Sequence, residues 1–170
     1  FDQSGWADGQ WLGSDSSTNG MMWSGTQFVG VGWGGAGATT WTSPDGSTFT
    51  YHDPGLGQQS NLDDVTWNGI DQYIAVGYFG HIISSPDGST WSTEVSNTSG
   101  NLYGVTHGGG QYMAVGASGA IVTSPEGTLW SARDSTISTN LYDVVYAGTE
   151  YVAVGASGRI VTSADGAVWS

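Results

Sequence analysis

Residues 112–130 read YMAVGASGAIVTSPEGTLW, and the pattern recurs without gaps as YIAVGYFGHIISSPDGSTW at 73–91 and YVAVGASGRIVTSADGAVW at 151–169. A more divergent copy occupies residues 28–49. The serine of each copy repeats after 42, 39 and 39 residues, at Ser43, Ser85, Ser124 and Ser163. Repeats of about 40 residues built from short strands are typical of β-propeller blades. The sequence therefore predicts an all-β fold of four such blades.

Each unit is expected to form four short antiparallel strands joined by tight, glycine-containing turns. In the third unit these strands fall at residues 101–107, 111–116, 120–124 and 129–131. A lone sheet of this size is marginal in water because neither face is covered, whereas stacking blades around an axis covers both. We therefore favour a propeller over a parallel β-helix or a sandwich. A β-helix rung of this length would be long, and a sandwich does not explain the repeat.

The repeats divide residues 17–170 into four blades, at about 17–60, 61–100, 101–139 and 140–170. Residues 1–16 have no counterpart in the repeat, and three interpretations remain open. The segment can pair with the last blade and close a ring, or it can exchange with another copy to build a dimeric ring or filament. Alternatively, the whole sequence is part of a larger propeller. The closed blade number stays open as well. The first unit also carries an insertion at residues 33–38.

The composition excludes several classes of partner. The 170 residues include 29 Gly and 9 Trp, no Cys and no Lys, and the formal net charge is -13. Binding to nucleic acid or to anionic membranes depends on Lys and Arg, so we expect neither partner. No apolar run approaches the roughly 20 residues needed to cross a bilayer, so membrane insertion is not expected. An acidic surface without lysine suits an extracellular or cell-surface bacterial protein.

A Ser-x-acid-Gly turn closes each unit and has a mechanical interpretation. Pro, where present, sets the first corner, the acid accepts hydrogen bonds from amides just ahead of it, and Gly accepts the positive φ. The turn residues are Ser43, Asp45, Gly46, Ser85, Asp87, Gly88, Ser124, Glu126, Gly127, Ser163, Asp165 and Gly166. We predict that they are structural.

This turn resembles the Asp-box, or BNR-type, hairpin of bacterial sialidase-like propellers. The whole unit, as in NLYGVTHGGGQYMAVGASGAIVTSPEGTLW, is similar to the repeats of photosystem II assembly factor-like propellers, and the resemblance covers residues 17–170. Two departures are an altered spacing between Asp and Trp by one residue and the acid Glu126 in the third copy. In that family the box is structural and lies away from any active site, so the resemblance implies a fold and no chemistry.

No catalytic constellation stands out. Sialidase-type chemistry needs an arginine cluster, and the chain has only Arg133 and Arg159, at different positions of the repeat. Paired carboxylates of a glycosidase are harder to exclude, although Asp63 and Asp64 are expected on opposite faces of a strand. The three histidines fall at three different blade positions, so we predict no metal site and no cofactor beyond adventitious calcium.

One positional set suggests a binding surface. An aromatic or imidazole ring ends the first strand of each unit, at Trp23, Trp67, His107 and Tyr146. First strands line a propeller's channel, so these rings are expected near one mouth, where they can grip a sugar or a peptide. The competing interpretation is packing between blades. We predict a non-catalytic binding or assembly scaffold for a protein or glycan. The alternatives are a self-associating filament or ring subunit and a carbohydrate-active enzyme that uses channel carboxylates.

Overall fold

The computed structural model describes residues 16–170, which form four antiparallel sheets, here called blades one to four. Blade one comprises β1 (Ser17–Trp23), β2 (Phe28–Trp33), β3 (Ala38–Ser43) and β4 (Thr50–His52). Blade two comprises β5 (Leu62–Trp67), β6 (Tyr73–Gly77), β7 (Ile82–Ser85) and β8 (Ser92–Thr93). Blade three comprises β9 (Leu102–Gly108), β10 (Gln111–Gly116), β11 (Ile121–Ser124) and β12 (Ser131–Arg133). Blade four comprises β13 (Leu141–Tyr146), β14 (Tyr151–Gly155) and β15 (Arg159–Ser163).

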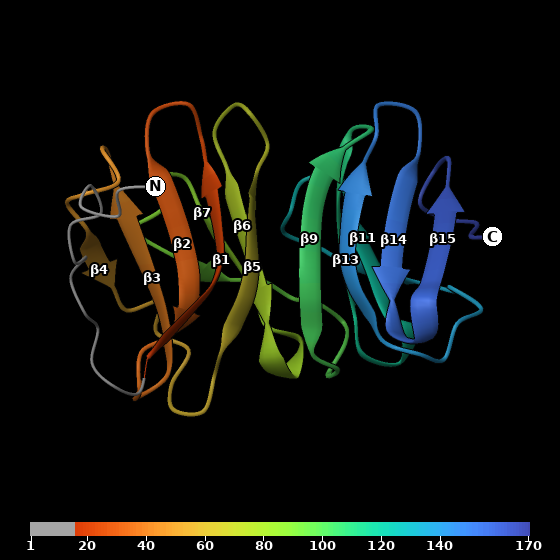
Figure 1. The fold of residues 1–170 in the computed structure, drawn as a ribbon, viewed down its shortest axis with the longest axis horizontal. Helices are drawn as coiled ribbons and strands as arrows, with labels where there is room; N and C mark the ends of the chain where they lie inside the picture. Colours follow the sequence, from red (N-terminus) through yellow and green to blue (C-terminus); the bar gives the residue numbers. More distant parts are fainter. Residues whose placement is uncertain (1–15) are drawn as a thin grey trace, which may run out of the picture.

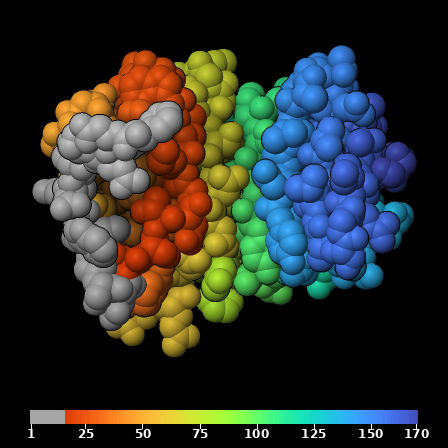
Figure 2. Space-filling model, in the orientation of Figure 1, coloured from red at the N-terminus to blue at the C-terminus, as the bar shows by residue number. Residues whose placement is uncertain are grey.

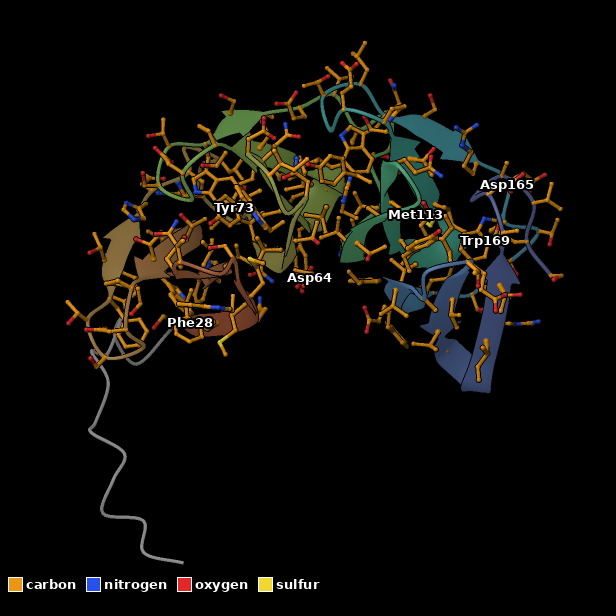
Figure 3. The ribbon with its side chains drawn as sticks, turned by 90° about the horizontal axis from the view of Figure 1, so that it is seen from above. Phe28, Asp64, Tyr73, Met113, Asp165 and Trp169 are labelled. Atoms are coloured by element: carbon orange, nitrogen blue, oxygen red, sulfur yellow. The ribbon has the colours of Figure 1, made fainter. Side chains whose placement is uncertain are left out.

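The blades stand side by side along an arc, with the first strand of each on the concave side (Figures 1 and 3). β1, β5, β9 and β13 are the inner strands, and the later strands of each blade lie farther out. This radial arrangement confirms the predicted all-β propeller architecture and differs from the stacked rungs of a β-helix or the two layers of a sandwich. Blades one and four lie at opposite ends of the arc. The predicted closing segment, residues 1–16, lies outside the described residues except for Ser16.

Both faces of the inner blades are apolar because alternate residues of a strand point to opposite sides. We call the side turned toward the following blade the forward face and the opposite side the backward face. The forward face of blade two carries Ile74, Val76 and Ile82. These residues form one buried cluster with the backward face of blade three, at Leu102, Val105, Tyr112, Ala114, Val122 and Trp130. The other two junctions repeat this arrangement at equivalent positions.

The hairpin from the second to the third strand is a short 3-10 turn in the last three blades, η1 (Tyr78–Gly80), η2 (Ala117–Gly119) and η3 (Ala156–Gly158). Its middle residue adopts a left-handed conformation, with φ of 59° at Phe79, 55° at Ser118 and 60° at Ser157. In blade one the predicted insertion forms the longer hairpin between Trp33 and Ala38.

Besides one-residue shifts at the ends of β9 and β11, the expected strands need two corrections. The fourth strand of blade three begins at Ser131 rather than at residue 129, because Trp130 still belongs to the turn. Its Nε1 donates to the carbonyl of Gly127 at 3.0 Å while its ring is buried. The last blade has three strands instead of four among the described residues. Ser170 begins a fourth pairing by exchanging two backbone hydrogen bonds with Thr162, at 3.0 and 3.1 Å.

Candidate functional site: the concave face

The inner strands form a concave face, which Figure 2 shows hollowed over β5 and β9 between the two end blades. The pairing between the first and second strands is interrupted by a bulge near the start of the first strand in blades one, two and four. The register of β9 with β10 shifts at the same place in blade three. A bulge leaves one residue out of the ladder and re-aims its side chain. The bulged positions are Asn19, Asp63, Tyr103 and Tyr142.

The two tyrosines of this set form a contact between blades three and four. The Tyr103 and Tyr142 ring centroids are 5.9 Å apart at an interplanar angle of 50°, and Tyr142 is 51% exposed. An aromatic pair of this kind presents apolar faces and hydroxyl edges to a ligand. This pair was not predicted from the sequence, although both tyrosines follow the leucine that begins the first strand and so occupy the same position of the repeat.

Asp64 lies on the concave side of the arc, where it bridges two blades (Figure 3). Its Oδ1 accepts the amide of Val65 at 2.8 Å, and its Oδ2 accepts the amide of Val105, in the next blade, at 2.9 Å. Burial raises the pKa of Asp64 to about 6 despite these two hydrogen bonds, which favour the charged form. Both oxygens are therefore engaged, Oδ1 within blade two and Oδ2 in the hydrogen bond that joins blades two and three.

Its neighbour Asp63 belongs to a polar network between blades one and two. Asp63 Oδ1 accepts Nδ2 of Asn61 at 3.1 Å, and Asn61 Oδ1 accepts Nδ2 of Asn19 at 2.9 Å. Burial, with a smaller contribution from the Asp64 charge, raises the pKa of Asp63 to about 6. Its Oδ2 is buried without a hydrogen-bond partner. The two acids are neighbours in the inner strand β5, but they have different surroundings.

The predicted aromatic set occupies equivalent places in all four blades. Each ring packs on the aromatic residue at or next to the start of the second strand of its own blade. The centroids are 4.2 to 4.9 Å apart in the pairs Trp23–Phe28, Trp67–Tyr73, His107–Tyr112 and Tyr146–Tyr151. Trp67 and Tyr146 also pack against the cores between blades. Trp23 is 48% exposed. Ligand binding by this set stays a prediction.

The three Ser-x-acid-Gly turns that contain Asp, in blades one, two and four, have the hydrogen bonds expected of them. In blade two, the Ser85 hydroxyl accepts the amide of Gly88 at 2.8 Å, and Asp87 Oδ1 accepts the amides of Ser89 and Thr90, both at 2.8 Å. These bonds lower the pKa of Asp87 to about 2. The same arrangement lowers the pKa of Asp45 to about 2 and lowers that of Asp165.

A groove of about 390 Å³ lies between blades two and three, beside the turns. Its lining includes Gln72, His107, Tyr112, Pro125 and Glu126. The Tyr112 hydroxyl donates to Gln72 Oε1 at 2.9 Å, burial raises the Tyr112 pKa to about 12, and burial lowers the pKa of His107. Both groups are therefore neutral near pH 7. A larger hollow of about 450 Å³ in blade one is bordered by the predicted insertion.

The described residues do not assemble a catalytic or metal centre from the other candidates. Arg133 donates from Nε to Thr123 at 2.8 Å on blade three, whereas Arg159 is exposed on blade four. The Ser60 hydroxyl lies 3.4 Å from His81 but donates to the carbonyl of Leu56 at 2.8 Å. Within residues 16–170, no three His, Cys, Asp or Glu side chains gather closely enough to hold a metal ion. None of the helices in that range is long and apolar enough to cross a membrane.

Comparison with solved structures finds the same architecture elsewhere. The structure titled YCF48 bound to D1 peptide matches with a TM-score of 0.66 and 19% identity over 92% of this chain and 52% of that chain. The fold is a β-propeller. The WD40 β-propeller domain of Doa1 matches with a TM-score of 0.67 and 14% identity over 91% of this chain and 53% of that chain. The computationally designed Ika4 protein matches with a TM-score of 0.69 and 15% identity over 92% of this chain and 98% of that chain.

The propeller thus spans about half the length of YCF48 and of the Doa1 domain, and nearly the whole of Ika4. At these identities the likeness concerns the fold alone. No family model matches the sequence. A search of curated proteins also finds no match.

Proposed function

We propose that this β-propeller is a non-catalytic scaffold that holds a peptide segment of a partner protein against its concave face. The observation that carries the proposal is an aromatic pair on neighbouring inner strands, in which Tyr142 is exposed and Tyr103 is half-buried. One propeller of the same architecture, YCF48, has been solved with a D1 peptide, which supports peptide binding as a use of this fold.

The charge of the chain favours a basic peptide. The net charge of -13 gives the molecule a negative field that attracts Lys- and Arg-containing segments and repels acidic ones. A guanidinium or ammonium group over a tyrosine face gains cation–π attraction as well. The bound segment would then lay its cationic side chains over the two tyrosine rings.

The surroundings of the inner-strand acids argue against a glycosidase. A paired-carboxylate mechanism needs one free acid and one free carboxylate facing the substrate. Asp64 uses both oxygens to bind backbone amides of Val65 and Val105. The proposal therefore assigns Asp64 a structural role and requires no cofactor.

The test is fluorescence anisotropy with fluorescein-labelled dodecapeptides, one rich in Lys and Arg and one with Asp and Glu at the same positions. We expect the basic peptide alone to bind, with an affinity that falls as salt is raised. Tyr142→Ala should weaken binding about 5- to 30-fold, since stacked aromatic contacts and cation–π pairs contribute about 1–2 kcal/mol. Tyr78→Ala is the matched control, because Tyr78 is exposed on the η1 turn, outside the inner strands.

Equal binding of both peptides, or an unchanged affinity of the Tyr142→Ala variant, would contradict the proposal. A glycan ligand is the second candidate, favoured by the exposed indole of Trp23. Binding on a glycan array that is lost in Trp23→Ala but kept in Tyr142→Ala would favour it.

The proposal includes an extracellular or cell-surface bacterial setting. Its support is the acidic composition without lysine and the similarity of the repeats to Asp-box propellers of secreted proteins. Detection of the protein in the culture medium or at the surface of intact cells tests this setting, and confinement to the cytosol would contradict it.

A further inference from the structure

The forward face of blade four is built like the faces that are buried elsewhere in the molecule. Ile160 occupies the place of Ile82 and Ile121, and Val154 occupies that of Val76 and Val115. Ile160 is 66% exposed and Val154 is 40% exposed, whereas their four counterparts are at most 1% exposed. The face thus carries the residues of a blade junction with no blade packed on it among residues 16–170.

The backward face of blade one is the complementary surface. Its Met21 occupies the place of Val65, Val105 and Val144, which are at most 5% exposed, yet Met21 is 63% exposed. We infer that the forward face of blade four packs on the backward face of blade one of a second copy of this chain, and the reverse, so that two copies close one ring of eight blades. This assembly goes beyond the binding function and does not depend on it.

At one position of the inner strands, Gly and Asp alternate from blade to blade. The alternation would continue unbroken from blade four of one copy to blade one of the other. The residue before the apolar position of each inner strand is Gly20, Asp64, Gly104 and Asp143 in turn. At Gly20 and Gly104 the next blade approaches so closely that a Cβ would lie 2.8 and 2.9 Å from the Cα of Asp64 and Asp143, respectively. The glycines therefore allow the backbone of the next inner strand to approach, and the aspartates are placed to bind the blade that follows them.

Asp64 shows what such an aspartate does. One oxygen accepts the amide of its own neighbour Val65, and the other accepts the amide of Val105 in the next blade. Asp143 already binds its own neighbour, with Oδ1 accepting the amide of Val144 at 2.8 Å. In the closed ring, Asp143 Oδ2 would accept the amide of Met21 of the second copy, which holds the place of Val105 in the register.

The Ser-x-acid-Gly turns indicate the same junction between blade four of one copy and blade one of the other. Gly88, Gly127 and Gly166 pack on Val29, Ile74 and Met113 of the preceding blade. Val152 holds that place in blade four, and Gly46 of a second copy would be the matching glycine. At the opposite edge, a Cβ on Gly80 or Gly119 would meet the following linker, whereas one on Gly158 would meet nothing within 4 Å.

One residue departs from the pattern and provides a gain-of-function variant. Gln27 lies just before β2 and Gln111 begins β10. Their Nε2 atoms donate to the carbonyls of Asp87 and Asp165 in the next blade, at 2.8 and 2.9 Å. Glu150 holds this position in blade four, and a carboxylate cannot donate to the Asp45 carbonyl of a second copy. Glu150→Gln should therefore tighten the association.

The experiment is sedimentation equilibrium of the 1–170 chain from about 1 μM to about 1 mM. We expect a mass twice the 17.6 kDa of one chain, with tighter association at higher salt because salt screens the repulsion between two acidic chains. Ile160→Asp and Met21→Asp should each weaken dimerisation at least about 100-fold, since each buries an unpaired carboxylate. Ile70→Asp is the control, because Ile70 is 80% exposed in the loop between β5 and β6.

A mixture of the two interface variants sharpens the test. In a closed ring, one chain of each variant shares one junction with both substitutions and one junction with neither. The mixture should therefore form more dimer than either variant alone. Because Ile160 and Met21 are exposed in the single chain, the urea midpoints of the dilute variants should match that of the unaltered protein.

Three results would overturn the inference. A mass of one chain at every concentration shows that the faces do not meet, and a mass that grows without limit shows an open filament. A dimer that is sensitive to Ile160→Asp but insensitive to Met21→Asp shows that the forward face pairs with a different surface.

Discussion

Blades two and four have nearly the same sequence on their forward faces but opposite surroundings. Ile82 and Val76 are fully buried against blade three, whereas Ile160 and Val154 are exposed. The residue types are the same, so burial here is decided by the neighbouring blade and not by the repeat itself. Stability in such an array is a sum of contributions from each unit and each junction. The comparison therefore predicts where substitutions matter.

The largest expected effect separates these two isoleucines. Ile82→Ala should lower the free energy of unfolding by about 2–5 kcal/mol, because it leaves a cavity in the core between blades two and three. Ile160→Ala should change it by less than about 0.5 kcal/mol in dilute solution, where its side chain stays in water. Urea unfolding followed by tryptophan fluorescence measures both. Equal losses in the two variants would show that the blades do not depend on their neighbours.

The next effect separates acids at a covered junction from acids in exposed turns. Asp63 and Asp64 bind protons more tightly in the folded state, because burial raises their pKa values from 3.8 to about 6. Stability should therefore fall as pH rises from about 4 to about 6, by on the order of 2 kcal/mol from Asp64. The lowered pKa of Asp45, Asp87 and Asp165 acts in the opposite direction, so stability should also fall as pH drops from about 4 to about 2.

Urea unfolding at a series of pH values tests this account, which places maximum stability near pH 4–5. Asp63→Asn should flatten the curve between pH 4 and 6 and leave the acid limb unchanged. A stability that rises steadily from pH 4 to pH 7 would be incompatible with carboxylates buried at the junction.

The smallest effect separates two turns of the same type. Asp87→Ala removes the acceptor of the Ser89 and Thr90 amides and should cost about 1 kcal/mol, as the loss of a side-chain cap does. Glu126→Ala should cost less, because the hydrogen bond that orders its turn joins the Ser124 hydroxyl and the Gly127 amide at 2.9 Å. Thermal unfolding compares the two variants. A greater loss from Glu126→Ala would mean that its longer side chain caps the turn after all.

The fold could be predicted from the sequence because the same pattern of strands and turns recurs in several copies of the repeat. Alternation in YIAVG and YMAVG places apolar residues on both faces, and the glycine turns limit the strand lengths. The strand at residues 111–116 was predicted with its observed ends. The start of β12 was not, because Trp130 reads as a strand residue until its hydrogen bond to Gly127 is seen.

The site was less predictable. The Tyr103–Tyr142 contact depends on the distance between two blades, and this distance cannot be predicted from the sequence pattern within one blade. The bulge between Leu62 and Asp64, which takes Asp63 out of the ladder, was also not predicted. Open faces at the two ends also cannot be read from the repeat, since every unit carries the same apolar residues.

Hydrogen exchange of the backbone amides tests the central claim most directly, that the end faces of this propeller are blade junctions completed by a second copy. Measured at about 1 μM and about 500 μM, amides of β1, β14 and β15 should exchange more slowly at the higher concentration. Amides of β6 and β7, which already lie between blades, should not change. Equal exchange in β1, β14 and β15 at both concentrations would contradict the claim.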